Sequence, residues 1–247
     1  MTSTAVDGLD NGGTLEALAG LRAVVTGGTS GLGLALVRAL RAAGAQVAFV
    51  ARSSGRVAEV AHETGATGIV GDVANKEDIH RIALQVGASV GAGGAIDLLV
   101  NNASSLGPVP LRPLGDTDCE DLEAALAANL VGPFRLTKAL LGPLVSSARE
   151  GRASVVLNVS SDAAKNAYAT WGAYGASKAA LAHLSAVWGE ELAREHVRVL
   201  SIDPGDMDTP LHELALPGSD RASLRRPEDA ARELLDAVIA ARSEVRS

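Results

Sequence analysis

Six short runs rich in valine, isoleucine and leucine recur along the chain, and segments with helical spacing separate them. The runs occupy residues 22–26, 46–51, 67–71, 96–101, 154–159 and 197–202. The helical segments occupy residues 32–43, 56–64, 76–86, 118–145, 174–195 and 227–241. Continuous apolar runs of this length are typical of strands buried on both faces of a parallel sheet. The alternation therefore predicts an α/β fold with one doubly wound parallel sheet between two layers of helices.

The 247 residues divide into a short tail and one large domain. Residues 1–17 are rich in Gly, Thr and Asp without periodicity, which predicts a flexible N-terminal tail. No change of composition interrupts residues 18–247, so we expect a single domain there, large enough to bury a core without disulfides.

Charge and hydropathy exclude several classes of partner. The chain has 22 Lys and Arg against 29 Asp and Glu, and its net charge of −7 repels nucleic acid and anionic membranes. No apolar stretch approaches the roughly 18 residues that a membrane span needs. The single cysteine, Cys119, and an N-terminus unlike a secretory signal favour the cytoplasm.

A glycine-rich loop joins the first run to the first helix. It reads Thr26-Gly27-Gly28-Thr29-Ser30-Gly31-Leu32-Gly33. Glycines there permit a tight turn and a close backbone approach, while the helix N-terminus offers free N–H groups to a pyrophosphate. The alternative is a glycine-rich turn without a ligand, but the position between strand and helix favours a dinucleotide site.

Arg52 lies 19 residues after Gly33, where a dinucleotide-binding unit reads the ribose. An acidic residue there would bind the 2′-hydroxyl, whereas Arg52 and Ser53 suit a 2′-phosphate, so the sequence predicts NADP(H). The alternative for Arg52 is a solvated surface charge. Asp72, after the third run, could accept a bond from the adenine amino group or cap the next helix, although Asn75 is better placed to cap.

Tyr174 and Lys178 are four residues apart on an expected helix, so they project from one face. An ammonium beside a phenol favours the phenolate, and the nearby helix N-terminus acts in the same direction. Ser161 directly follows the fifth run, where its hydroxyl could polarise a substrate oxygen. Neighbouring Ser160 is the less favoured choice, and a serine pair that caps a turn is the alternative interpretation.

Asn129 lies inside an apolar helix, where an amide is a poor core residue. Pro133, four residues later, has no N–H and crowds the carbonyl of residue 129. We therefore expect a kink that leaves this main-chain carbonyl free to bind water or a cation. A simple packing kink is the alternative, but it leaves the asparagine unexplained.

Together these motifs resemble the short-chain dehydrogenase/reductase family over about residues 18–236, and the NADP-preferring members in particular. The matching motifs are Thr26-Gly27-x-x-x-Gly31-x-Gly33, Asp72, Asn101-Asn102-Ala103, Asn129, Ser161, Tyr174-x-x-x-Lys178 and Pro204-Gly205. The resemblance implies a Rossmann-like fold and a catalytic tetrad of Asn129, Ser161, Tyr174 and Lys178. The resemblance implies that Tyr174 transfers the hydroxyl proton of the substrate and that Ser161 positions the substrate carbonyl. It implies that Lys178 lowers the Tyr174 pKa and binds the ribose of the cofactor. It also implies that the main-chain carbonyl of Asn129 holds a water molecule of a proton relay.

With Arg52 and Ser53 from the spacing argument, the expected cofactor contacts extend around the whole carboxyl edge of the sheet. They are Gly27, Ser30, Gly31, Leu32, Gly33, Arg52, Ser53, Asp72, Val73, Asn102, Ala103, Tyr174, Lys178, Pro204, Gly205, Met207 and Thr209. No metal site is expected. The resemblance also implies a homodimer paired through the two long helices, with a tetramer possible.

The chain departs from the family pattern in two places. After the last helix it stops at residue 247, so the last strand of the sheet must be short or missing. The loop after Gly205 carries Asp206 and Asp208 on either side of Met207, which leaves open how that loop is oriented.

The predicted activity is NADP(H)-dependent interconversion of a small carbonyl compound and its alcohol. A non-catalytic NADP-sensing or scaffold protein of the same fold is the first alternative, and a methyltransferase with a similar loop is the second. Residues expected around the substrate are Ser105, Leu106, Pro108, Ala163, Tyr168, Trp171, Leu211 and Leu214, with Lys165 and His212 either near a substrate carboxylate or solvated.

Overall fold

The computed structural model describes residues 16–90 and 94–246. Of the predicted tail, residues 1–15 lie outside the described residues, and residues 16–18 form a helical turn from which Leu18 is buried. None of the helices in these two ranges is long and apolar enough to cross a membrane.

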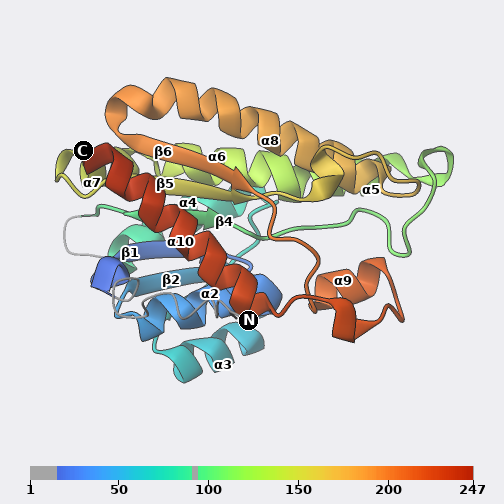
Figure 1. The fold of residues 1–247 in the computed structure, drawn as a ribbon, viewed down its shortest axis with the longest axis horizontal. Coiled ribbons are helices and arrows are strands. Elements are labelled where there is room, and N and C mark those ends of the chain that lie inside the picture. Colours follow the sequence, from blue (N-terminus) through green and yellow to red (C-terminus); the bar gives the residue numbers. More distant parts are fainter. Residues whose placement is uncertain (1–15, 91–93, 247) are drawn as a thin grey trace, which may run out of the picture.

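One parallel sheet of six strands forms the centre of the fold, in the order β3-β2-β1-β4-β5-β6 (Figure 1). The strands are β1 (Arg22–Thr26), β2 (Gln46–Ala51), β3 (Thr67–Val70), β4 (Leu98–Asn101), β5 (Ser154–Val159) and β6 (Val197–Ile202). The order reverses between β1 and β4, the kind of switch point at which doubly wound sheets bind ligands. The predicted fold class is confirmed, and no strand follows the last helix within the described residues.

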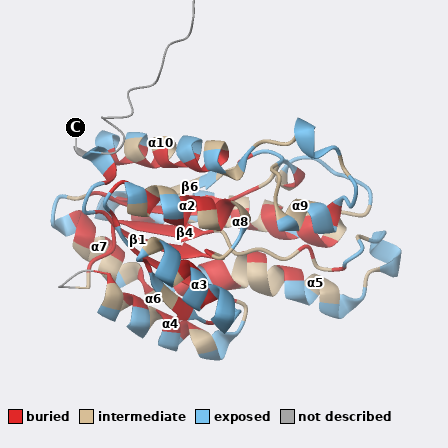
Figure 2. Cartoon of the chain, turned by 90° about the horizontal axis from the view of Figure 1, so that it is seen from below, coloured by how far each residue is buried: buried red, intermediate tan, exposed pale blue. Residues whose placement is uncertain are grey.

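Two layers of helices cover the sheet. On one face lie α2 (Gly31–Ala42), α3 (Ser54–Thr64) and α10 (Pro227–Arg246). On the other lie α4 (Lys76–Ser89), α5 (Cys119–Leu126), α6 (Gly132–Ala139), α7 (Leu141–Arg149) and α8 (Gly172–Leu192). The sides of these helices that face the strands are buried and the outer sides exposed, as Figure 2 shows for α10 and α4. A short helix, α9 (Pro210–Ala215), lies between β6 and α10 and has no counterpart among the predicted elements.

The predicted helix over residues 118–145 is broken twice. At residues Ala127–Val131 the chain forms a π-helical turn around Asn129, which is the disturbance expected from Pro133. At Leu140 the helix ends and α7 begins, a break that the prediction missed. Pro143 explains it, because its ring crowds the carbonyl four residues earlier and it has no N–H to donate.

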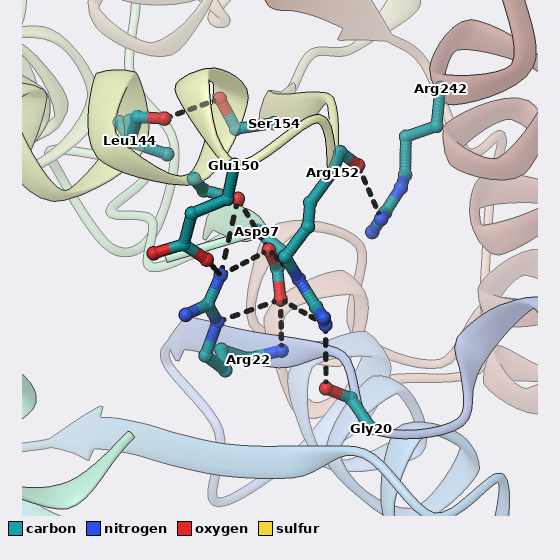
Figure 3. A network of polar contacts seen from close by, with 9 residues as sticks. Gly20, Arg22, Asp97, Leu144, Glu150, Arg152, Ser154 and Arg242 are labelled. Carbon is teal, nitrogen blue, oxygen red and sulfur yellow. Dashed lines mark hydrogen bonds and ion pairs between the residues drawn. The ribbon is translucent and has the colours of Figure 1, made fainter. Parts of the chain in front are cut away.

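A charged cluster holds the amino ends of the central strands together (Figure 3). The side chain of Asp97 is fully buried and accepts hydrogen bonds from the Arg22 backbone N–H at 2.8 Å, from the Arg22 guanidinium and from Arg152 Nε at 3.0 Å. Ser147 also donates to it. Arg242 of α10 donates to the Arg152 carbonyl at 2.7 Å, which ties the last helix to the cluster.

Burial alone would raise the pKa of Asp97. The hydrogen bonds from Arg22, Arg152 and Ser147 outweigh it and hold the pKa well below its usual range. This cluster lies where strands begin, at the opposite edge of the sheet from the carboxyl ends, so it stabilises the fold without entering the site described next.

Candidate active site

A cavity of about 680 Å³ opens at the carboxyl ends of the strands, within the usual size range of small-molecule sites. The loops after all six strands line it, together with the first turns of α2 and α8. Every residue predicted to bind cofactor lines this cavity, as do Ser161, Tyr174 and Lys178. Asn129 does not line it and is fully buried behind it.

At Gly27 and Gly33 the glycine-rich loop leaves no space for a side chain. Gly27 has φ +70°, and a Cβ on Gly33 would lie 2.2 Å from the Gly27 carbonyl oxygen. Ser30 precedes α2 without making a side-chain capping bond, so the first N–H groups of that helix face the cavity without such a cap. This is the geometry that a pyrophosphate needs.

The loop after β4 is fastened to the glycine-rich loop. Thr26 Oγ1 accepts hydrogen bonds from the backbone N–H groups of Asn102 at 2.9 Å and Ala103 at 3.0 Å. Asn102 Nδ2 returns a bond to the Thr26 carbonyl at 2.9 Å. These hydrogen bonds join the loop after β4 directly to the end of β1 at the cavity lining.

Arg52 is exposed at the end of β2 and lines the cavity. Ser53 caps α3 by accepting the Arg56 N–H, so its hydroxyl is partly engaged in the helix start. Arg56, which the prediction did not include, extends from α3 to the glycine-rich loop and donates to the Thr29 carbonyl at 3.4 Å. The sequence signal was present, since Arg56 lies one helical turn after Arg52.

Asp72 lines the cavity after β3, and its carboxylate accepts the Ala74 N–H at 2.9 Å. Asn75 caps α4 by accepting the Glu77 N–H at 3.1 Å. The helix cap is thus Asn75, and the carboxylate of Asp72 stays at the cavity wall.

Tyr174 and Lys178 lie on the first turns of α8, and both are buried at the inner end of the cavity, with 7% and 2% exposed. Lys178 Nζ donates to the Val159 carbonyl at 2.7 Å. Ser161 Oγ accepts the Ala163 N–H at 3.2 Å and donates to Asp162 Oδ1 at 3.1 Å.

The protonation equilibria differ from the sequence-based expectation that Lys178 lowers the Tyr174 pKa. Burial raises the pKa of Tyr174 to about 12, and the hydroxyls of Ser161 and Ser104 lower it only in part. Burial likewise lowers the pKa of Lys178 to about 8. The reason is that removal from water disfavours the charged form of both groups, and here it outweighs their neighbours.

Asn129 has all its amide hydrogen-bonding capacity filled. Its Nδ2 donates to the Ser105 carbonyl at 2.7 Å and to Ser177 Oγ at 2.8 Å. Its Oδ1 accepts the Ser105 N–H at 2.8 Å and the Ser104 hydroxyl at 3.1 Å. The side chain therefore braces the loop after β4 against α8, which accounts for an amide in an apolar helix.

The loop after β6 has a defined orientation. Asp208 turns to Arg221, which donates two hydrogen bonds at 2.8 Å, whereas Asp206 lines the cavity. Arg225 pairs with Met207 in a short parallel bridge and donates to the Pro204 carbonyl at 3.0 Å. Of the two acids, only Asp206 faces the cavity.

The residues expected around the substrate divide into two groups. Lining the cavity are Ser105, Leu106, Trp171, Leu211, His212 and Leu214. Outside its lining are Pro108, Ala163, Lys165 and Tyr168. Tyr168 is 48% exposed and donates to Asp162 Oδ2 at 2.7 Å. The prediction missed two polar lining residues near Tyr174, Ser104 and Asp162, which directly follow motif residues.

Among the described residues, no group of three or more His, Cys, Asp or Glu side chains could hold a metal ion. The polar chemistry of the cavity therefore comes from hydroxyls, amides, isolated carboxylates and cations.

Comparison with known proteins agrees with this arrangement. Residues 22–218 match the sequence profile of the family described as short chain dehydrogenase. A putative ketoacyl reductase of the granaticin polyketide synthase from Streptomyces violaceoruber is 34% identical over 195 residues, which cover 77% of this chain and 69% of the relative.

Solved structures extend the similarity to nearly the whole chain. A putative short chain dehydrogenase from Pseudomonas syringae has a TM-score of 0.82 and 31% identity, with 90% of each chain covered. Another, from Escherichia coli CFT073 in complex with NADPH, has a TM-score of 0.81 and 26% identity, with 91% of this chain and 92% of that chain covered. The chain therefore belongs to the short-chain dehydrogenase/reductase family of oxidoreductases.

Proposed function

We propose that this chain is an NADP(H)-dependent oxidoreductase that interconverts a ketone or aldehyde and the corresponding alcohol, with Tyr174 as the general acid and base. The observation that carries the proposal is one continuous cavity. At its inner end lie the Tyr174 phenol, the Ser161 hydroxyl and the Lys178 amine, and at the other end lie the glycine-rich loop and Arg52.

The cavity walls fit a nicotinamide dinucleotide with a 2′-phosphate. The uncapped start of α2 and the space kept open by Gly33 suit the pyrophosphate. Arg52 suits the 2′-phosphate, because a guanidinium forms strong paired hydrogen bonds with phosphate oxygens. Support also comes from relatives whose solved structures hold NADP or NADPH. The role of Lys178 toward the ribose is part of this proposal.

The cofactor would supply the hydride, and the residues of this chain would manage the proton. In the reductive direction the Ser161 hydroxyl donates a hydrogen bond to the substrate carbonyl oxygen and holds it near Tyr174. The Tyr174 hydroxyl then gives its proton to the oxygen as negative charge develops there. The main-chain carbonyl of Asn129, in the π-helical turn, would hold the water that restores this proton.

The experiment is a consumption assay for NADPH and NADH with a panel of ketones and aldehydes, paired with a binding titration of each cofactor. Turnover with NADPH, lost in Tyr174→Phe, supports the proposal. Tight NADPH binding without turnover on any substrate favours the non-catalytic sensor instead. Failure to bind either dinucleotide contradicts both.

We also propose that the chain forms a homodimer through the outer faces of α6 and α8. Phe134 and Trp188 pack in a tilted arrangement with ring centroids 6.0 Å apart, and Phe134 and Val187 are 37% and 41% exposed. Sedimentation velocity at micromolar concentration tests this, and Val187→Glu should shift a dimer to monomer. A monomeric parent protein contradicts it.

A further inference from the structure

The hydroxyl of Ser161 donates its single hydrogen to a neighbouring carboxylate. The acceptor is Asp162 Oδ1 at 3.1 Å, and because an ionised carboxylate can only accept, the direction of this bond is fixed. Ser161 Oγ also accepts the Ala163 N–H at 3.2 Å, which fills one of its two acceptor positions. What Ser161 still offers at the lining of the cavity is therefore an acceptor and not a donor.

Asp162 is held through both its backbone and its side chain. Its carbonyl accepts the N–H groups of Lys165 at 2.9 Å and Asn166 at 3.0 Å, so the short turn after Ser161 sets its backbone position. Its second carboxylate oxygen, Oδ2, accepts the Tyr168 hydroxyl at 2.7 Å. The Ser161 hydroxyl and the Tyr168 phenol thus bind the carboxylate at its two oxygens.

The two forms of a substrate make opposite demands on Ser161. A carbonyl oxygen carries no hydrogen and can only accept, so it bonds to Ser161 only if the serine hydrogen leaves Asp162. An alcohol can donate its own hydrogen to the remaining acceptor position of Ser161, and the bond to Asp162 stays in place. Asp162 therefore competes with a carbonyl compound for one hydrogen and does not compete with the alcohol.

We propose that Asp162, held by Tyr168, is a positioning residue that favours binding of the alcohol over binding of the carbonyl compound. It acts through Ser161, whose O–H must turn from Asp162 Oδ1 to the carbonyl oxygen before hydride transfer. Only hydrogen bonds are exchanged in this step, and no proton leaves Ser161. The inference rests on the proposed function for the two substrate forms, but the binding experiment that tests it needs no turnover.

Dead-end complexes measure this preference without chemistry. Cyclohexanone with NADP⁺ and cyclohexanol with NADPH cannot exchange a hydride, and neither probe is chiral. Ligand-observed NMR titrations give the dissociation constant of each. Asp162→Ala should bind cyclohexanone about five-fold more tightly, the scale of one hydrogen bond, and cyclohexanol with unchanged affinity. A merely structural role for Asp162 would instead weaken the binding of both probes.

Two further variants separate the hydrogen bond from the negative charge. Asp206→Ala removes another carboxylate from the same cavity lining and should leave the ratio of the two dissociation constants unchanged. Tyr168→Phe lets Asp162 turn toward water, so it should strengthen cyclohexanone binding by a smaller factor than Asp162→Ala. It also serves if Asp162→Ala does not fold. Parent-like cyclohexanone binding in Asp162→Ala, weaker binding of both probes, or an equal gain in Asp206→Ala overturns the proposal.

The contact between Tyr168 and Asp162 has its own readout, because the chain contains only two tyrosines. With ¹³Cζ-labelled tyrosine, Tyr174→Phe leaves the ring resonance of Tyr168 alone. The hydrogen bond to Asp162 raises the pKa of Tyr168, so Asp162→Ala should lower the pH at which this resonance titrates. An unchanged titration, or parent-like cyclohexanone binding in Tyr168→Phe, overturns the part assigned to Tyr168.

Kinetics should show the same effect as a split between KM and kcat. In reduction of cyclohexanone, or of the best ketone in the panel, Asp162→Ala should lower KM about five-fold with kcat unchanged, because Ser161 already donates to the bound carbonyl. Since the overall equilibrium is fixed, kcat/KM for oxidation of the matching alcohol should rise by the same factor. If the parent turns over no ketone or alcohol, the proposed function fails while the dead-end titrations still decide the role of Asp162. Shifted binding with kcat/KM unchanged in both directions overturns a role in the reaction.

Discussion

The ammonium of Lys178 lies over the ring of Tyr174, 5.6 Å from the ring centroid, while its hydrogen bond goes to the Val159 carbonyl at 2.7 Å. The hydrogen bond to Val159 in β5 holds the Lys178 ammonium in place, and the ammonium acts on the Tyr174 ring electrostatically across this distance. Burial makes the charged forms of both residues unfavourable in the ligand-free cavity. Burying these two groups therefore lowers the free energy of unfolding by an amount that depends on pH.

This cost predicts the pH dependence of stability. Burial lowers the Lys178 pKa from 10.5 to about 8, so below pH 8 the folded protein bears the full penalty of a buried ammonium. As pH rises through 8, the folded state releases its proton before the unfolded state does, and the free energy of unfolding rises. Between pH 8 and 10 the gain should be about 2 to 3 kcal/mol.

Urea denaturation of the cofactor-free protein at several pH values measures this slope. Lys178→Met should remove it, whereas Lys138→Met, at an exposed position on α6, should keep it. Above pH 10 the trend should reverse, because the raised pKa of Tyr174, about 12, keeps the folded phenol protonated while the unfolded one ionises. A flat profile for the parent protein between pH 8 and 10 would contradict this account.

Tyr174→Phe should reduce kcat for carbonyl reduction by about 100-fold or more, the usual scale for the loss of an acid–base group. The ring fills a small apolar cluster with Leu106, Trp171 and Leu211, and phenylalanine preserves that packing. Thermal unfolding and NADPH binding should therefore match the parent protein. Lys178→Ala should weaken NADPH binding as well as kcat, which distinguishes the two residues. Near-normal turnover in Tyr174→Phe would remove the proposed mechanism.

Cofactor preference should depend on two arginines and not on one. Loss of one charge-assisted contact at roughly 1.5 to 3 kcal/mol predicts about a 10- to 150-fold preference for NADPH over NADH in kcat/KM. Arg52→Ala should erase most of this ratio. Arg56→Ala should reduce it by less, because Arg56 is held against the Thr29 carbonyl and also pairs with Glu59.

Steady-state kinetics with one ketone in one buffer gives the ratio for each variant. Arg38→Ala is the matched control, since Arg38 pairs with Glu63 on the surface and, among the described residues, makes no hydrogen bond to the glycine-rich loop. Equal kcat/KM for the two cofactors in the parent protein would show that Arg52 points into solvent.

Much of the fold could be predicted because buried parallel strands leave an unmistakable pattern of short apolar runs. The predicted run 96–101 was longer than the observed strand β4 (Leu98–Asn101), since Ile96 bonds to the Pro143 carbonyl and not to a strand. The short helix α9 was missed because six residues are too few to show a helical period.

The motif residues lie together because parallel strands deliver their carboxyl ends to one edge. What the sequence could not show were contacts between side chains far apart in the chain. The hydrogen bond from Arg56 to the Thr29 carbonyl and the one from Ser104 to the Asn129 amide oxygen form only because the fold brings these segments together in space. The rise of the Tyr174 pKa to about 12 could not be foreseen either, since its main cause is burial, which depends on the packed fold and not on the spacing to Lys178.

Asp97→Asn should be among the most destabilising single substitutions in this chain. The carboxylate is fully buried and bound by two arginines, and a neutral amide would leave both cations underpaired, at a cost of about 3 to 5 kcal/mol. The pKa of Asp97 is held below its unfolded value, so its contribution is present above about pH 4 and is lost as pH falls further. Chemical denaturation at pH 7 and pH 3 should show the difference between parent and variant shrinking at the lower pH. A constant difference would exclude Asp97 as the source of acid sensitivity.

Gly33→Ala should abolish dinucleotide binding while Gly87→Ala leaves it intact. A Cβ at position 33 would lie 2.2 Å from the Gly27 carbonyl oxygen and 2.5 Å from Asn102 Nδ2, and the backbone atom cannot rotate away. The glycine-rich loop must then move off the start of α2, which disrupts the N–H groups proposed to hold the pyrophosphate. Gly87 lies in α4, and a Cβ there would have no neighbouring atom within 4 Å, so alanine should stabilise the protein by roughly 1 kcal/mol. Titration of NADPH fluorescence measures binding in both variants, and circular dichroism confirms that each is folded. A folded Gly33→Ala protein that binds NADPH as tightly as the parent would show that the dinucleotide does not approach this loop.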